Sequence, residues 1–145
     1  MNEEIFHLGV KALIRNNKGE ILLLENNSEI SKSTISEHWD LPEGRLEKGD
    51  SLEKALRREV KEEIGIRKIK IGNLLDASVS KIRIVSGKNS FGLILFTYTC
   101  YIVDKSEVKL TDDEHVSFKW FKPSEAGKLL SVKFSDSLAE KVASL

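Results

Sequence analysis

Residues 41–66 combine many charged side chains with apolar residues that recur at the spacing of an α-helix. A helix advances by about 100° per residue, so one set of apolar side chains falls on a common face. This set comprises Leu52, Ala55, Leu56 and Val60. Glu59 and Glu63 fall within the same face, whereas most of the basic residues fall on the opposite one, where they keep the helix soluble. The pattern therefore predicts an amphipathic helix that turns two carboxylates toward the core.

Both ends of this helix carry residues that favour its start and its stop. Asp50 is expected to cap the N-terminus, and Glu53 stands three residues later, as in an acidic capping box. Gly65 suits the left-handed conformation that follows many helices. The helix is therefore expected to run from about Ser51 to Ile64.

Three acidic side chains of the helix need compensation. Glu59, Glu62 and Glu63 stand at positions i, i+3 and i+4, and a desolvated carboxylate is costly unless it is paired, protonated or bound to a cation. A single neighbouring Arg58 cannot neutralise all three, because each carboxylate raises the pKa of the others. Oxygen ligands select hard cations such as Mg²⁺, which keeps waters and completes its coordination with substrate phosphates. The helix therefore predicts a metal site that handles phosphate.

The same segment resembles the Nudix box, in which glycine, glutamate and arginine recur at fixed spacing before an aliphatic residue. In this sequence the box runs from Gly44 to Ile66 with its spacing intact, and Asp50 stands in place of the first glutamate. Glu43 stands where many family members have a second glycine. The resemblance implies a Nudix hydrolase with an α+β fold, an αβα sandwich around a mixed β-sheet.

The resemblance also implies roles for individual residues. Glu59, Glu62 and Glu63 are expected to bind Mg²⁺ or Mn²⁺, and Arg58 is expected to orient Glu59 through a charge-assisted hydrogen bond. The implied reaction is hydrolysis of a diphosphate linkage, in which a carboxylate accepts a proton from the attacking water. That base is the glutamate matching Glu59 in some members and a distant loop acid in others, for which Glu114 is the candidate; Glu114 as an exposed turn residue is the alternative. The catalytic candidates are Arg58, Glu59, Glu62 and Glu114.

Length and composition indicate one domain that binds a small molecule. The chain has 145 residues, of which 40% are hydrophobic, enough for a single core spanning residues 1–145. The formal net charge is +0, with 23 basic and 23 acidic residues, which argues against nonspecific binding to nucleic acid or membranes. We therefore expect a small nucleotide substrate, with no nucleic acid or membrane partner, and leave a homodimer open.

A lone cysteine and the absence of an evident targeting signal favour a soluble cytoplasmic protein. Cys100 cannot form an internal disulfide and lies in an apolar run, which indicates a buried thiol. The start "MNEEIF" is acidic rather than basic. The apolar run 91–103 is too short to span a bilayer and is rich in strand-forming residues.

Strand and helix signals alternate along the rest of the chain. Two hairpins are expected, around "NNKG" and "SGKNS". The strands are predicted at 5–15, 20–25, 39–41, 69–84, 91–103 and 116–121. Two further helices are predicted at 123–130 and 135–145.

Other polar and aromatic residues are more simply explained by structural roles. Trp39 could stack on a base, but a strand tryptophan more often packs. Asp112 and Asp113 are expected to solvate a turn, although one could contact an outer metal. The histidines lie too far apart in the sequence to suggest a metal cluster, and they are His7, His38 and His115.

The substrate is inferred by elimination. ADP-ribose hydrolases of the family often carry a proline beyond the box, and dinucleoside polyphosphate hydrolases a tyrosine; the corresponding "SKIRIV" has neither. This favours a nucleoside triphosphate or modified nucleotide, with ADP-ribose or another nucleotide sugar as the alternative. A module of the same fold that senses a nucleotide without cleaving it stays open, but the three helix acids favour an enzyme. A diphosphate isomerase would need further catalytic Cys and Glu sites, which lone Cys100 does not supply.

Overall fold

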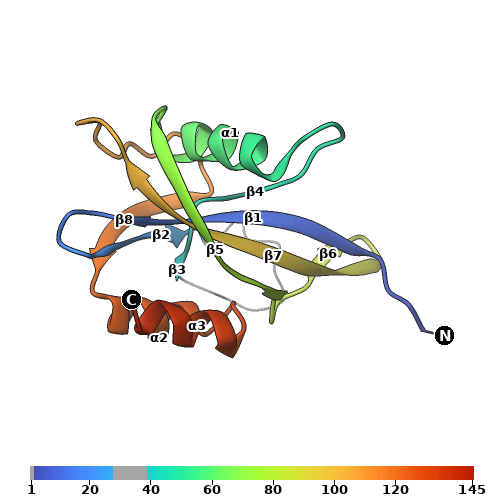
Figure 1. The fold of residues 1–145 in the computed structure, drawn as a ribbon. Coiled ribbons are helices and arrows are strands. Elements are labelled where there is room, and N and C mark those ends of the chain that lie inside the picture. The colour runs from blue at the N-terminus through green and yellow to red at the C-terminus, as the bar shows by residue number, and fades with distance from the viewer. Residues whose placement is uncertain (1, 28–38) are drawn as a thin grey trace.

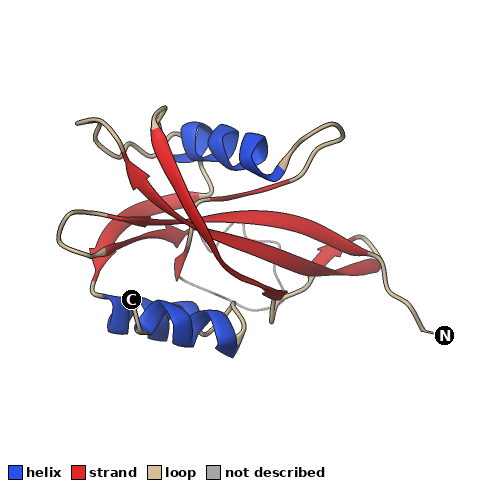
Figure 2. Cartoon of the chain, in the orientation of Figure 1, coloured by secondary structure: helices blue, strands red, loops and turns tan. Residues whose placement is uncertain are grey.

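The chain folds into a mixed β-sheet with helices on both faces (Figures 1 and 2). The computed structural model describes residues 2–27 and 39–145. Helix α1 (Leu52–Ile64) covers one face, whereas α2 (Pro123–Leu130) and α3 (Asp136–Ala143) cover the other (Figure 1). The strands are β1 (Phe6–Arg15), β2 (Ile21–Asn26), β3 (Trp39–Asp40), β4 (Glu43–Arg45), β5 (Ile69–Val79), β6 (Ile84–Ser86), β7 (Asn89–Ile102) and β8 (His115–Phe121). This arrangement confirms the predicted αβα sandwich.

Pairing along β1 places β4, the strand that leads toward α1, beside the middle of the sheet. The main strand order is β3-β2-β1-β7-β5, with β4 on β1, β6 on β7 and β8 on β2. Strands β1 and β7 run parallel, and the other described pairs run antiparallel. Residues Gly9 to Lys11 pair with β4, whereas Arg15 pairs with Ile21 of β2. The middle of β1 therefore pairs with the segment that precedes α1.

Alternate side chains of β1 and β2 enter two different cores, because neighbouring residues of a strand point to opposite faces. On one face, apolar residues of the strands pack with α1; these include Val10, Ala12, Ile14, Leu22, Leu24, Ala55, Leu56, Val60 and Ile64. On the other face they pack with α2 and α3; these include Leu13, Ile21, Leu23, Ala126, Leu130, Leu138 and Val142. The apolar face predicted for the helix is thus the face that α1 buries.

The predicted limits of α1 are nearly correct, but its predicted N-cap is wrong. Ser51, not Asp50, caps the helix, since its hydroxyl accepts a hydrogen bond from the backbone amide three residues later at 3.1 Å. Asp50 accepts a hydrogen bond from the Glu47 amide at 2.8 Å and pairs with Arg58 instead. Gly65 ends the helix with φ 70°, as expected. The Asp50 carboxylate, predicted to cap the helix, therefore binds Arg58 and the Glu47 amide instead.

The second predicted hairpin is interrupted. The predicted strand 69–84 is two strands, because β5 ends at Val79 and β6 starts at Ile84. Between them, the Ser80 amide donates to the Leu93 carbonyl at 2.8 Å and the Lys81 amide donates to the Lys133 carbonyl at 2.8 Å. These contacts replace regular pairing and tie the break to the segment between α2 and α3.

The remaining predicted elements are largely confirmed. The hairpin at "NNKG" joins β1 and β2, and its Gly19 has φ 76°. Helix α2 matches the predicted 123–130, whereas α3 ends at Ala143 instead of residue 145. Ser135 caps α3 by accepting a hydrogen bond from the Leu138 amide at 3.2 Å. Within the described ranges, none of the helices is long and apolar enough to cross a lipid bilayer.

Residues assigned to packing do pack. Cys100 is buried, and burial raises the pKa of its thiol to about 12. The Trp39 ring meets Phe121 edge to face, with centroids 4.9 Å apart. The ring of His7 lies 4.8 Å from that of Phe91. Of the three histidines, His38 lies outside the described residues.

Candidate active site

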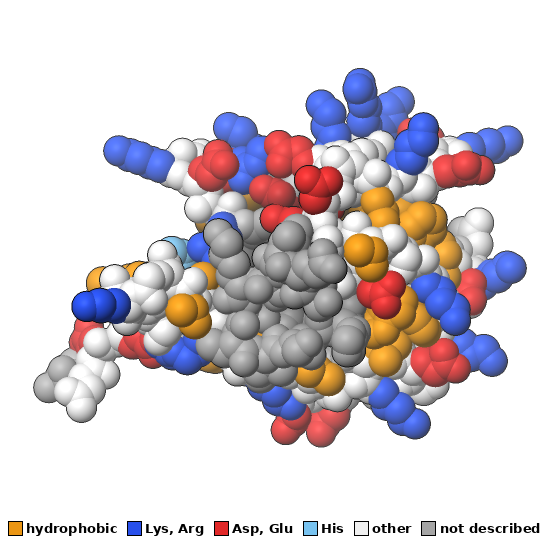
Figure 3. Space-filling model, turned by 180° about the vertical axis from the view of Figure 1, so that it is seen from behind, with side chains coloured by type: hydrophobic (Ala, Val, Ile, Leu, Met, Phe, Trp, Pro, Cys, Tyr) orange, Lys and Arg blue, Asp and Glu red, His pale blue; other side chains and the backbone are white. Residues whose placement is uncertain are grey.

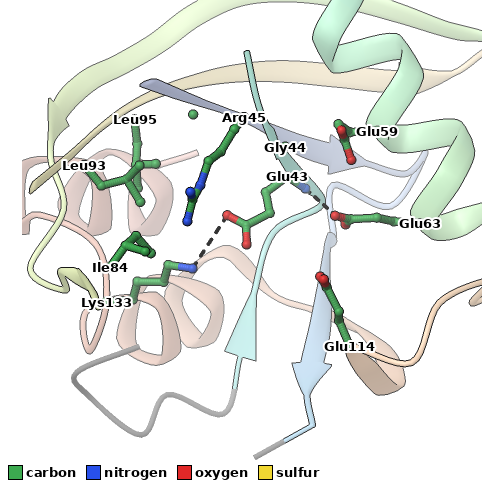
Figure 4. Close-up of a pocket in the computed structure, with 11 residues that line it drawn as sticks. Glu43, Gly44, Arg45, Glu59, Glu63, Ile84, Leu93, Leu95, Glu114 and Lys133 are labelled. Atoms are coloured by element: carbon green, nitrogen blue, oxygen red, sulfur yellow. Dashed lines mark hydrogen bonds and ion pairs between the residues drawn. The ribbon is translucent and has the colours of Figure 1, made fainter. Parts of the chain in front are cut away.

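A cavity of about 330 Å³ lies beside β4 and is lined by acids on one side and aliphatic residues on the other. Figure 4 shows the side chains of Glu59, Glu63 and Glu114 grouped together, away from Leu93 and Leu95. In a view from behind, lysines and arginines project from the top of the molecule, and several acids gather below them (Figure 3). The cavity therefore places carboxylates and apolar surface within reach of one small ligand.

Glu59 is half-buried and lies among other carboxylates. Burial raises the pKa of its carboxyl group, the nearby Glu62 raises it further, and Arg58 opposes the shift. Glu114, from the segment before β8, adds to the repulsion. The Glu59 side chain also lies against the backbone of Gly44. The tertiary fold thus joins the helix acids to the loop acid that the sequence singled out.

Arg58 is held chiefly by Asp50. Its Nη1 donates to both carboxylate oxygens of Asp50, at 2.9 and 2.8 Å. Its Nε lies 3.6 Å from Glu59 Oε1, an ion-pair distance rather than a hydrogen bond. The backbone amide of Glu47 and then Arg58 lower the pKa of Asp50. Asp50 thus anchors the arginine that lies beside Glu59.

Glu63 is the most buried of the box acids, with 5% of its surface exposed. Its Oε2 accepts a hydrogen bond from the Glu43 amide at 3.1 Å. Burial raises the pKa of its carboxyl group to about 10, although Lys11 opposes the shift. Among the described residues, no basic nitrogen forms an ion pair with it within 4.0 Å. A buried carboxylate with so little compensation, beside two other acids, fits a site for a cation.

Glu62 lies at the exposed rim of the site. Its side chain is exposed, and its backbone carbonyl accepts a hydrogen bond from Thr111. Glu114 is also exposed, but it lines the cavity with Glu59 and Glu63. The structure therefore brings three of the predicted acids to one cavity and leaves Glu62 beside them.

His115 lies closer to the site than sequence spacing indicated. One potential ligand atom from each of Glu63, Asp112 and His115 lies within 4.8 Å of the other two. His115 Nδ1 is 3.2 Å from Asp112 Oδ1, a contact that also gives the buried ring a partner. This group could hold a cation, and the Asp112–His115 contact is consistent with the structural role predicted for His115.

Sequence reasoning missed a group of four charged side chains that adjoins Glu63 through Glu43, and three of the four are buried. Lys11 lies 3.1 Å from Asp40 and also pairs with Glu43; Lys133 pairs with the same two acids, lying 3.7 Å from Glu43. Burial lowers the pKa of Lys11 to about 7. Burial would raise the pKa of Asp40, but Lys11 and Lys133 lower it to about 2. The available signal was one lysine within the apolar stretch "LGVKALI".

The fold and the acid-lined cavity define a protein of the Nudix class. The family model described as NUDIX domain matches residues 5–141, and the chain belongs to this family. An RNA pyrophosphohydrolase from Caulobacter vibrioides is 26% identical over 117 residues, covering 72% of this chain and 67% of that protein. The nucleoside triphosphatase NudI from Escherichia coli is 31% identical over 91 residues, covering 60% of this chain and 63% of that protein.

Solved structures agree with this assignment. The crystal structure of a MutT protein from Methanosarcina mazei Go1 superposes with a TM-score of 0.71 at 28% identity, covering 98% of this chain and 94% of that one. The chain spans about two thirds of the length of the two sequence relatives, 67% and 63%. Family membership and these relatives support the prediction of a hydrolase that acts on pyrophosphate bonds.

Proposed function

We propose that this chain, acting as a single catalytic domain over residues 1–145, is a Mg²⁺- or Mn²⁺-dependent pyrophosphohydrolase of nucleoside triphosphates or modified nucleotides. The observation that carries the proposal is the meeting of Glu59, Glu63 and Glu114 in one cavity (Figure 4). Carboxylates gathered in this way repel one another unless a cation joins them. Their oxygen-only donor set suits a hard divalent ion.

The box residues divide the chemistry between them. Glu59, Glu62 and Glu63 would hold the cation, which when bound neutralises charge on the substrate phosphates. Glu59 or Glu114 accepts the proton of the attacking water. Arg58, anchored by Asp50, keeps Glu59 in place through their 3.6 Å ion pair.

The opposite wall of the cavity supports a nucleotide substrate. Ile84, Leu93 and Leu95 offer an aliphatic surface on which a base can lie, and Arg45 on the same lining offers charge to phosphates. The relative named as a nucleoside triphosphatase supports the triphosphate choice. ADP-ribose or another nucleotide sugar is the alternative, and the relative named as an RNA pyrophosphohydrolase adds RNA 5′ ends to the substrates to be tested.

A substrate panel tests the proposal. The protein is incubated with nucleoside triphosphates, ADP-ribose and 5′-triphosphorylated RNA, in Mg²⁺ and separately in Mn²⁺, and products are separated by chromatography. We expect monophosphate and pyrophosphate from triphosphates. AMP and ribose 5-phosphate from ADP-ribose alone would move the assignment to the alternative. No turnover of any diphosphate compound would favour a nucleotide-sensing module and overturn the proposal.

Two substitutions in α1 test whether Glu59 is required for turnover. Glu59→Gln keeps the shape of the side chain but removes its charge from the cavity, so turnover should fall about a hundredfold or more. The matched control is Glu53→Gln, which removes an exposed charge paired with Arg57 at 2.9 Å on the outer surface. This control should keep near-normal turnover. Near-normal turnover of Glu59→Gln would instead make Glu59 a structural partner of Arg58.

A further inference from the structure

Building on the proposed metal site, we infer that Lys11 and Lys133 are positioning residues that set the orientation of Glu63 through Glu43. Neither lysine belongs to the box. Lys11 lies on β1, and Lys133 lies in the segment between α2 and α3. They connect the layer of α2 and α3 to the carboxylate that would bind the cation.

The two lysines form ion pairs with the same two acids, Asp40 and Glu43. Lys11 is fully buried and Lys133 is 4% exposed. Lys11 Nζ lies 3.1 Å from Asp40 Oδ1 and also contacts Glu43; Lys133 Nζ contacts Asp40 and lies 3.7 Å from Glu43 Oε2. Both ammonium groups also lie near the face of Phe134, at 5.3 and 6.0 Å from its centroid. Two lysines and two acids therefore contact one another in one group, of which Lys11, Lys133 and Asp40 are buried and Glu43 is partly exposed.

Glu43 connects the two lysines to Glu63. Its backbone is paired with Lys11 across β1 and β4, and its side chain is held by both lysines. Its amide N–H then donates to Glu63 Oε2 at 3.1 Å. Figure 4 shows the route as two successive contacts, from Lys133 to the Glu43 carboxylate and from Glu43 to Glu63. One oxygen of Glu63 is thereby occupied, which leaves the other for a cation.

A purely structural role explains these charges poorly. Burying ions costs desolvation free energy, and replacing a buried ion cluster by apolar side chains is often neutral or stabilising. Hydrogen bonds to metal ligands, by contrast, orient the ligand, and their loss typically weakens metal affinity about 10- to 100-fold. The Glu43 amide is such a bond, and the lysines fix the residue that provides it.

Metal binding without nucleotide tests this role separately from catalysis. Mn²⁺ affinity of the whole chain is measured by calorimetry and by the loss of the free-ion electron paramagnetic resonance signal. Glu43→Gln removes the charge that the lysines hold and keeps the backbone N–H; its side chain is 32% exposed, so the variant should fold. We expect its dissociation constant for Mn²⁺ to rise about tenfold or more.

A double-mutant cycle tests whether Lys133 acts through Glu43. Lys133→Met should also weaken Mn²⁺ binding, and the Glu43→Gln/Lys133→Met double variant should bind Mn²⁺ as Glu43→Gln does, because residues of one network are non-additive. Lys141→Met is the control, since Lys141 pairs with another buried acid, Asp76, at 2.8 Å on the α3 side of the fold. The control should leave Mn²⁺ affinity unchanged.

The outcomes separate this inference from the proposed function. If the unaltered chain binds no Mn²⁺, the proposed metal site itself fails. If it binds Mn²⁺ and Glu43→Gln binds it equally well, the metal site stands and the positioning role is overturned, even if melting temperatures fall. If Lys133→Met weakens binding equally with and without Glu43→Gln, the route through Glu43 is wrong. Glu43→Gln decides the question alone if Lys133→Met fails to fold.

Discussion

Glu59 occupies the space that a side chain at position 44 would need. A Cβ atom on Gly44 would stand 1.9 Å from Glu59 Cγ and 2.1 Å from its Cδ. Real side chains do not approach so closely, so any larger residue at this position would force the Glu59 side chain or the β4 backbone to move. The first glycine of the box is therefore explained by the path of the Glu59 side chain.

Gly44→Ala should displace Glu59 and abolish most of the activity. A misplacement of about 1 Å in a reacting group can cost about a hundredfold in rate, and we expect a loss of that size in kcat. Gly87→Ala is the control, because Gly87 has φ +61° and no atom within 4 Å of an added Cβ. It should cost about 1–2 kcal/mol of stability from backbone strain and leave kcat unchanged. Equal activity of the two variants would contradict the displacement of Glu59.

Asp50→Ala should lower activity by releasing Arg58. The lost pair is made at 2.8 Å, and Arg58 in turn lies beside Glu59, so kcat should fall on the order of tenfold, as when the supporting partner of a site residue is removed. Asp50→Glu should restore most of the rate, since it keeps the carboxylate. Ser51→Ala removes the helix cap instead and should cost about 1 kcal/mol of stability with normal kcat. Steady-state kinetics and thermal unfolding of all three variants check this assignment.

Glu114→Gln decides between the two candidate bases. If Glu114 accepts the proton, turnover should fall at least about a hundredfold. Asp113→Asn removes the neighbouring exposed charge, which does not line the cavity, and should have little effect. Normal rates in both variants would assign the base to Glu59.

Glu63 should make the metal-free protein less stable as pH rises. Burial raises the pKa of its carboxyl group from 4.5 to about 10 in the folded chain. A group with a raised pKa contributes its stability in full below pH 4.5 and loses it progressively as pH rises toward 10. In chelator, Glu63→Gln should therefore melt above the unaltered protein at pH 8 and no higher than it at pH 4. A pH-independent difference in melting temperature would contradict this account.

Features that depend on residues close together in the sequence could be predicted from the sequence. Helical spacing predicted the buried face of α1, and the turn residues predicted its end at Gly65 and the hairpin of β1 and β2. The box also located Glu59 and Glu63, because a helix holds residues three and four apart on one face. The sequence did not distinguish two adjacent residues that can both cap a helix, and Ser51 rather than Asp50 caps α1.

Contacts between residues far apart in the sequence became visible in the folded chain alone. The tertiary structure brought Glu114 to Glu59, paired β1 with β7 in parallel, and enclosed Lys11 and Lys133 around Asp40 and Glu43. Local spacing could not predict the partners of Lys11, a lone lysine in an apolar strand. The acids that offset the cost of burying it, Asp40 and Glu43, lie 29 and 32 residues away in the sequence. Such contacts follow from how the sheet closes between its two helical layers, because burying both apolar faces at once is what selects among the strand pairings that local propensity allows.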